Sequence, residues 1–167
     1  MKIYIMRHGE AAHSASADSL RPLTKQGVIE AEKMGQWLTR CRLTLKHVFV
    51  SPYLRAQQTC THTISVLKEV GLLNGVVSET LDFITPSGNA RQMHDFIDGL
   101  LQSNDGGLYE EYGVVLVSHM PFVSYLVAEL TDKITMPIFS TGAIAIIDYD
   151  IEKMQGQLVD IISPENQ

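Results

Sequence analysis

Short apolar runs alternate along the chain with segments in which apolar residues recur every three or four positions. The runs are typical of strands buried on both faces, and the spaced pattern is typical of amphipathic helices. We interpret six runs as strands, at residues 2–6, 47–50, 76–81, 114–117, 143–147 and 158–162. Helical patterns fill the intervals between most of them.

The helical segments carry recognisable start signals. Thr24 and Ser87 are suited to cap two helices, and Pro52 suits the start of a third. Strands that alternate with amphipathic helices indicate a three-layer α/β/α sandwich whose central sheet is largely parallel. The length of 167 residues fits one domain spanning 1–167.

Composition and charge exclude several classes of protein. A net charge of −6 argues against a nucleic-acid partner, which requires a basic face. No apolar run is long enough to span a membrane, and the first residues lack the features of a signal peptide, so we expect a cytoplasmic protein without a membrane partner. Cys41 and Cys60 are too few for a disulfide framework or a zinc site.

Candidate chemistry lies where three of the expected strands end. Arg7 and His8 follow the first strand, Arg55 lies in the first turn of the helix after the second, and His119 follows the strand at 114–117. Ligands of open α/β sheets bind outside the carboxyl ends of the strands. We therefore expect these four side chains to converge on one crevice.

The four residue types fit phosphoryl transfer. Arginine presents a fork of donors that suits phosphate oxygens, so Arg7 and Arg55 can hold a phosphoryl group and offset its charge. Neighbouring cations disfavour an imidazolium, so His8 is expected to be a neutral nucleophile, and His119 can donate to a phosphoryl oxygen. Transfer to His8 and hydrolysis by water complete a cycle that needs no metal and no cofactor.

A proton donor for the leaving group is less well defined. Glu79 and Asp82 follow the third expected strand, and Asp18 lies in a loop that can fold over His8. Each of these carboxylates can also be an ordinary solvated surface group. If the leaving group is itself an imidazole, a donor is less important, because the phosphorus–nitrogen bond is labile and the conjugate acid of a free histidine side chain has a pKa of about 6.5.

Taken together, these motifs resemble the histidine phosphatase superfamily, which has the phosphoglycerate-mutase-like fold. The motifs are Arg7-His8-Gly9-Glu10, Leu23-Thr24 with Gly27, Ser51-Pro52 with Arg55-Ala56 and Gln58-Thr59, and Ser118-His119. The resemblance implies that His8 is the phosphorylated nucleophile and that Arg7, Arg55 and His119 complete the phosphate pocket. Arg21 is close enough in sequence to touch the phosphate or a partner protein.

Within that superfamily, the chain is most similar to its short phosphohistidine phosphatases. Its length leaves little room for the insertions that cap the site of many members, so we expect no capping subdomain. An open crevice would admit a side chain of another protein. The resemblance implies a monomeric phosphatase acting on a phosphohistidine of a bacterial phosphorelay, in the phosphotransfer domain of a sensor kinase or a similar carrier.

Two other functions are compatible with the same residues. One is a phosphatase for small phosphate esters that uses the same pocket. The other is a non-catalytic protein that binds phosphate and never carries it on His8.

Overall fold

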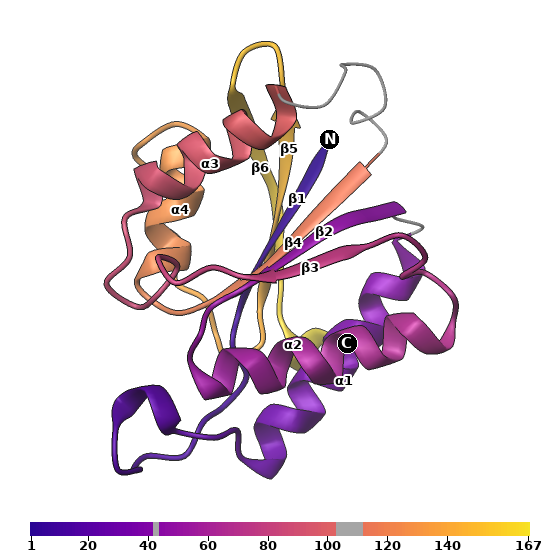
Figure 1. Cartoon of the computed structure of the whole chain (residues 1–167), viewed down its shortest axis with the longest axis vertical. Helices are drawn as coiled ribbons and strands as arrows, with labels where there is room; N and C mark the ends of the chain where they lie inside the picture. Colours follow the sequence, from indigo (N-terminus) through magenta and orange to yellow (C-terminus); the bar gives the residue numbers. More distant parts are fainter. Residues whose placement is uncertain (42–43, 103–111) are drawn as a thin grey trace.

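A six-stranded sheet forms the centre of the computed structural model, which describes residues 1–41, 44–102 and 112–167. The strand order is β3-β2-β4-β1-β5-β6 (Figure 1). The strands are β1 (Lys2–Arg7), β2 (Thr44–Val50), β3 (Val77–Thr80), β4 (Tyr112–Ser118), β5 (Ile144–Asp150) and β6 (Gln155–Ile162). The helices are α1 (Lys25–Arg40), α2 (Leu54–Glu69), α3 (Ala90–Gln102) and α4 (Phe122–Leu130), with short 3₁₀ turns η1 (Asp18–Leu20) and η3 (Pro164–Asn166).

The sheet is largely parallel, as expected. Strand β4 pairs in parallel with both β1 and β2, and β2 pairs in parallel with β3. Only β5 runs against its neighbours β1 and β6. The carboxyl ends of β1, β2 and β4 therefore meet at one edge of the sheet, where Arg7 lies opposite Ser118 and Val50 lies opposite Val117.

The helices form one layer on each side of the sheet, which confirms the three-layer sandwich. Helices α1 and α2 cover one face, and α3 and α4 cover the other (Figure 1). All four α-helices of the described residues belong to these layers. Within this part of the chain, no helical subdomain covers the carboxyl edge of the sheet.

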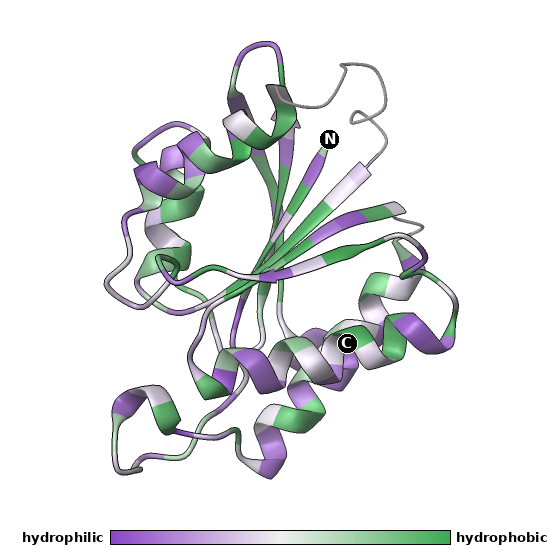
Figure 2. Ribbon diagram, viewed as in Figure 1, coloured by the Kyte–Doolittle hydropathy of each residue, from purple (hydrophilic) through white to green (hydrophobic). Residues whose placement is uncertain are grey.

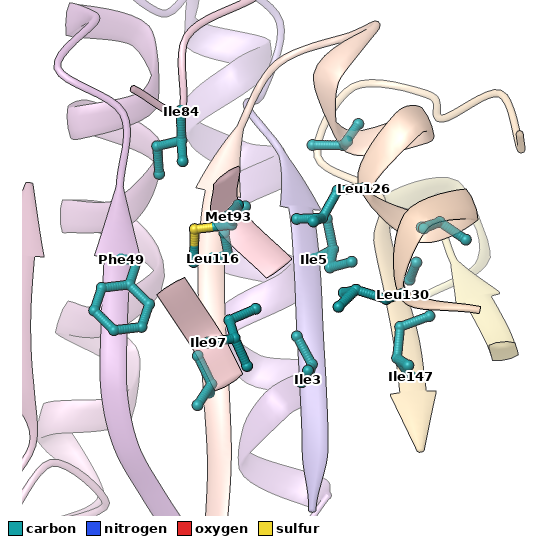
Figure 3. Packing of buried hydrophobic residues seen from close by; sticks show 14 of the residues in the cluster. Ile3, Ile5, Phe49, Ile84, Met93, Ile97, Leu116, Leu126, Leu130 and Ile147 are labelled. Atoms are coloured by element: carbon teal, nitrogen blue, oxygen red, sulfur yellow. The ribbon is translucent and has the colours of Figure 1, made fainter. Parts of the chain in front are cut away.

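Alternate residues of each central strand face different helical layers. In β1, Ile3 and Ile5 pack with α3 and α4, whereas Tyr4 and Met6 pack with α1 and α2. Figure 3 shows Ile3 and Ile5 beside residues of α3 and α4, and Figure 2 shows the apolar residues concentrated along the strands. A strand that is buried on both sides is held firmly, so the residues at its end have a fixed position.

Two of the three predicted helix starts differ from the structure. Thr24 caps α1 as expected, because its side chain accepts a hydrogen bond from Gly27 N. Helix α2 begins at Leu54, two residues after Pro52. Asn89, rather than Ser87, caps α3: its Oδ1 accepts from the backbone N–H of Arg91 at 2.9 Å, because the preceding residues form a turn closed by Gly88 N–H and Thr85 O.

Two glycines allow the loop after β1 to lie directly on the first turn of α1. A Cβ atom on Gly9 would lie 2.5 Å from the carbonyl oxygen of Gly27, and a Cβ on Gly27 would lie 2.1 Å from that of Glu10. Both neighbours are backbone atoms, which cannot rotate away. The position of His8 in the loop therefore depends on the absence of a side chain at residues 9 and 27.

We predict that Gly27→Ala lowers the free energy of unfolding by about 1–3 kcal/mol, because the added methyl group forces two backbone segments apart. Gly99→Ala is the matched control, since a Cβ at this exposed position in α3 meets nothing within 4 Å. The control should stabilise the protein by about 0.5–1 kcal/mol, because alanine loses less backbone entropy in a helix. Urea denaturation of both variants measures the difference, and equal stabilities would contradict the close packing.

Candidate active site

The side chains at three strand ends meet in one cluster. His8 follows β1, Arg55 lies in the first turn of α2, and His119 follows β4. The centroids of the two imidazole rings are 5.1 Å apart, and Arg55 Nε lies 3.2 Å from His8 Nε2. All three residues are buried. The structure thus brings three of the four expected side chains into contact at the carboxyl edge of the sheet.

Contacts with the backbone determine which nitrogen of His8 carries the proton. His8 Nδ1 lies 2.7 Å from the carbonyl oxygen of Gly9. A carbonyl oxygen can only accept a hydrogen bond, so Nδ1 is the protonated nitrogen of the neutral ring. The lone pair on Nε2 is therefore available, and it accepts the hydrogen bond from Arg55 Nε.

Arg55 is held by η1 as well as by His8. Its Nη1 donates to the carbonyl oxygen of Asp18 at 2.6 Å, and its Nη2 pairs with the Asp18 carboxylate at 3.1 Å. Arg21 pairs with the other carboxylate oxygen at 3.0 Å and donates through Nε to the carbonyl of Ala12. Arg21 therefore reaches the cluster through Asp18 rather than by direct contact with His8 or Arg55.

Arg7 is attached to a different segment of the chain. Its Nη1 donates to the carbonyl oxygen of Phe139 at 2.6 Å, in the loop that joins α4 to β5. Its buried Nε has no hydrogen-bond partner among the described residues. A buried donor without a partner is rare in folded proteins and calls for a ligand or a water.

His119 is oriented by two residues that follow β2. Its Nε2 lies 2.6 Å from Ser51 Oγ, and its ring packs edge-on against Tyr53 at 5.0 Å. Ser51 Oγ also accepts from Tyr53 N at 3.4 Å, and its hydroxyl can donate to His119 Nε2 when the ring proton is on Nδ1. His119 Nδ1 is the second buried atom near the site that has no partner among the described residues.

Burial keeps both imidazoles neutral at physiological pH. It lowers the pKa of His8 to about 4, with Arg55 and Arg7 adding to the shift, although the hydrogen bond to Gly9 opposes it. Burial is also the main reason that the pKa of His119 falls to about 3, followed by repulsion from His8. The predicted direction for His8 agrees with the structure, but desolvation contributes more to it than the arginines.

The three candidate carboxylates lie in different surroundings. Asp18 contacts the cluster through Arg55, and its hydrogen bond with Arg21 lowers the pKa of its carboxyl group below the usual range. Glu79 is exposed on β3, where its charge acts on His47 rather than on His8. Asp82 is exposed and forms no hydrogen bond or ion pair with any described residue. From the sequence, Glu79 and Asp82 were the first candidates for the proton donor to the leaving group. Of the three carboxylates, the structure brings only Asp18 into contact with the cluster.

Several residues that support the cluster were not given a role by sequence reasoning. Thr59 Oγ1 accepts from Gly9 N at 3.0 Å, and Gln58 Oε1 accepts from Leu23 N at 2.7 Å, so α2 holds the loop after β1. Both residues belong to the Gln58-Thr59 motif, which contributed to the family resemblance without an assigned role. No sequence signal pointed to Phe139, because its contribution is a backbone carbonyl.

Other features of the described residues do not form a second active site. A groove of about 1110 Å³ is lined by residues that include Met1, Tyr149 and Gly156, at the amino end of β1 and away from His8. Within residues 1–41, 44–102 and 112–167, no group of three His, Cys, Asp or Glu side chains is arranged to hold a metal ion. Cys41 and Cys60 are free thiols. No helix in this part of the chain is long and apolar enough to cross a membrane.

Comparison with known proteins agrees with the family resemblance. Residues 3–75 match the model of the histidine phosphatase superfamily, branch 1. The chain is 40% identical over 152 residues to the phosphohistidine phosphatase SixA of Escherichia coli, an alignment that covers 90% of this chain and 86% of that protein. It is 37% identical over 160 residues to the SixA homolog of Haemophilus influenzae, covering 93% and 92% of the two chains.

A solved structure gives the same result for the fold. The protein histidine phosphatase SixA complexed with tungstate superposes with a TM-score of 0.84 at 35% identity, covering 99% of both chains. The likeness extends over the sheet, both helical layers and the loops that carry the cluster.

The buried imidazoles predict a loss of stability in acid. In the unfolded chain a histidine takes up a proton near pH 6.5, whereas the folded pKa values of His8 and His119 are about 4 and about 3. The unfolded state therefore binds more protons than the folded state as the pH falls from 6.5 to about 3, and the free energy of unfolding decreases over that range.

We predict that His8→Asn makes this acid-dependent loss shallower, since one of the two buried imidazoles is removed. His13→Asn is the control, because His13 is exposed and meets water in both states. Urea denaturation at several pH values between 7 and 4 measures the slope. The same slope in wild type and His8→Asn would contradict the neutral, buried state of His8.

Proposed function

The chain belongs to the histidine phosphatase superfamily, and we propose that it is a phosphatase that removes phosphate from phosphohistidine in other proteins. The observation that carries this proposal is the state of His8: its Nδ1 proton is held by the Gly9 carbonyl, and its neutral Nε2 faces Arg55. This is the arrangement that a nucleophile for phosphorus requires. The two SixA relatives, which are named for this activity, support the choice of substrate.

The proposed reaction begins with attack by His8 Nε2 on the phosphorus atom. A bond forms between Nε2 and phosphorus, and the bond between phosphorus and the substrate nitrogen breaks, leaving its electron pair on that nitrogen. The substrate imidazole departs as a neutral ring after taking up one proton. Water then attacks the phosphorus atom, the bond between phosphorus and Nε2 breaks with its electron pair returning to Nε2, and phosphate leaves. The proton that the water loses goes to solvent and balances the one taken up in the first step.

We propose that three side chains bind the phosphoryl oxygens during both steps. Arg55 is next to Nε2 of the nucleophile, so its guanidinium is close to the reacting phosphorus. The Nε–H of Arg7 and the Nδ1–H of His119 are buried donors without a partner among the described residues. Binding an oxyanion would satisfy both donors and offset the charge that develops in the transition state.

We propose that the cycle uses no metal ion and no cofactor. Two arginines provide the positive charge that a metal supplies in other phosphatases. The tungstate complex of the related SixA structure supports an oxyanion site of this kind, because tungstate has the tetrahedral shape of phosphate.

Asp18 is proposed to position Arg55 rather than to act as the general acid. Its hydrogen bonds to Arg21 and Arg55 lower the pKa of its carboxyl group, which favours the ionised form. An ionised carboxylate has no proton to donate. With an imidazole as the leaving group, a strong acid is unnecessary, because the nitrogen that departs is readily protonated near neutral pH.

The substrate is proposed to be a protein rather than a small ester. No helical subdomain of the described residues covers the carboxyl edge of the sheet, so a side chain on another protein can reach His8. We propose a phosphotransfer domain of a bacterial phosphorelay or a similar carrier as the partner, with the enzyme acting as a monomer in the cytoplasm.

We predict that His8→Ala reduces dephosphorylation of a histidine-phosphorylated phosphotransfer domain by about 10³-fold or more, because the nucleophile is removed. With ³²P-labelled substrate and rapid quenching, wild type should carry a label that is labile to acid and stable to base, and His8→Ala should carry none. The assay contains a chelator, since the proposed cycle uses no metal. His62→Ala, on the surface of α2, is the control and should retain full activity.

Three results would contradict this proposal. Undiminished turnover by His8→Ala would reject the nucleophile, and loss of wild-type activity in the chelator would reject the metal-free cycle. Faster turnover of a panel of sugar and nucleotide phosphates would favour a small-ester phosphatase.

We predict that Asp18→Asn lowers kcat/KM for phosphohistidine by about 3–10-fold, because Arg55 loses one charged partner but keeps the carbonyl of residue 18. The pH profile should keep its shape. Removal of a general acid would instead reduce kcat by about 10²–10⁴-fold and change the alkaline limb. Glu79→Gln is the comparison variant, and steady-state kinetics from pH 5 to 9 measure all three proteins.

A hundredfold loss of kcat in Asp18→Asn would assign that carboxyl as the acid. The same loss in Asp82→Asn would contradict departure of the imidazole without a carboxylic acid.

A further inference from the structure

Each pocket arginine is attached to a surface loop that exposes a large apolar side chain beside the attachment point. Arg7 binds the carbonyl of Phe139, and the adjacent Ile138 is 88% exposed. Arg55 binds the carbonyl of Asp18, and Leu20 at the end of the same 3₁₀ turn is 53% exposed. The two loops are far apart in sequence, yet each binds an arginine of the candidate site through a backbone carbonyl and exposes an apolar side chain within two residues of it.

The loop between α4 and β5 presents its apolar residues in a fixed way. Phe139 is only 1% exposed and packs in the core formed with α3 and α4. On the other side of Ile138, Pro137 is partly buried, and the next residue, Met136, is 54% exposed. Because Phe139 anchors the loop on both its side chain and its carbonyl, Ile138 is held toward solvent rather than left free to fold inward.

Such exposure is unfavourable unless another molecule covers these side chains. Full burial of a Leu, Ile or Met side chain is worth about 1.5–3 kcal/mol relative to exposure. Single exposed apolar residues are common on protein surfaces, as Val70 at the end of α2 illustrates. Here, in contrast, Leu20 and Ile138 each lie within two residues of a carbonyl that binds an arginine of the candidate site.

We propose that Leu20 and Ile138, the apolar rim, form the contact surface for the protein that carries the phosphohistidine. This inference rests on the proposed function. A histidine side chain is short, so when its phosphoryl group reaches His8 the surface of the carrier protein lies against the loops at the pocket edge. Those loops are the ones that carry the rim.

Charge makes an apolar contact more suitable here than an ionic one. The chain has a net charge of −6, and the arginines nearest the pocket are directed at the phosphoryl group and at Asp18. Attraction between opposite charges is therefore concentrated on the phosphate itself. We infer that the partner has apolar side chains around its phosphohistidine, and that their burial against the rim supplies the affinity that is specific to the protein.

The test compares one protein substrate and one small substrate that share the same reacting bond. The probes are a phosphotransfer domain phosphorylated on histidine and free phosphohistidine. Ile138→Ser and Leu20→Ser should each raise KM for the domain by about tenfold, with kcat unchanged, since burial of a rim side chain is lost. Kinetic constants for free phosphohistidine should stay within twofold of wild type.

Two further variants separate docking from folding and from a general surface effect. Ile138→Leu keeps an apolar side chain of similar volume and should restore a KM close to wild type. Val70→Ser removes an equally exposed apolar side chain at the other end of α2 from Arg55, and it should leave both substrates unaffected. Thermal unfolding of each variant identifies any loss of folded protein.

The outcomes distinguish failure of the rim from failure of the proposed function. If KM for the phosphotransfer domain is unchanged in both Ile138→Ser and Leu20→Ser, the apolar rim is not the docking surface. The same conclusion follows if these variants lose kcat/KM equally on the domain and on free phosphohistidine. If the wild-type protein hydrolyses neither probe, the proposed function itself fails.

Discussion

The site depends on the burial of two imidazoles beside two guanidinium groups. Water is excluded from His8 and His119, and the neighbouring charges are positive, so each ring is stable only in its neutral form. A neutral imidazole has one proton, and its location decides what the ring can do. The Gly9 carbonyl places that proton on His8 Nδ1, and a hydrogen bond donated by the Ser51 hydroxyl would leave it on His119 Nδ1. In the proposed cycle, His8 is then the nucleophile and His119 a donor to the phosphoryl group.

The fold makes this arrangement possible because it fixes the ends of three neighbouring strands. Each strand is buried on both faces, so its last residue cannot shift without disturbing a packed layer. The loop after β1 then bends closely over the first turn of α1, where two glycines meet without side chains. Thr59 completes the support by accepting the Gly9 N–H, which links α2 to the residue that orients the nucleophile.

The sequence predicts those parts of the candidate site that depend on the type of side chain and on the position of each strand end. The convergence of His8, Arg55 and His119 could be predicted from the sequence alone, because buried strands that run parallel end at one edge. Contacts made by backbone atoms could not be foreseen in this way, since every residue has a carbonyl; the attachment of Arg7 to residue 139 is the main example. The position of Asp18 was also uncertain, because an irregular loop has no periodicity from which to predict where it folds.

Backbone attachment of the two arginines has an evolutionary consequence. The carbonyls of residues 18 and 139 are present whatever side chains those loops carry, so substitutions at Leu20 or Ile138 leave the main anchors of Arg7 and Arg55 in place. If the apolar rim is the docking surface, partner choice and chemistry are encoded in separate parts of the same loops. A lineage could then change the protein that it recognises by drift in a few exposed residues, while the rate of the proposed reaction at His8 stays constant.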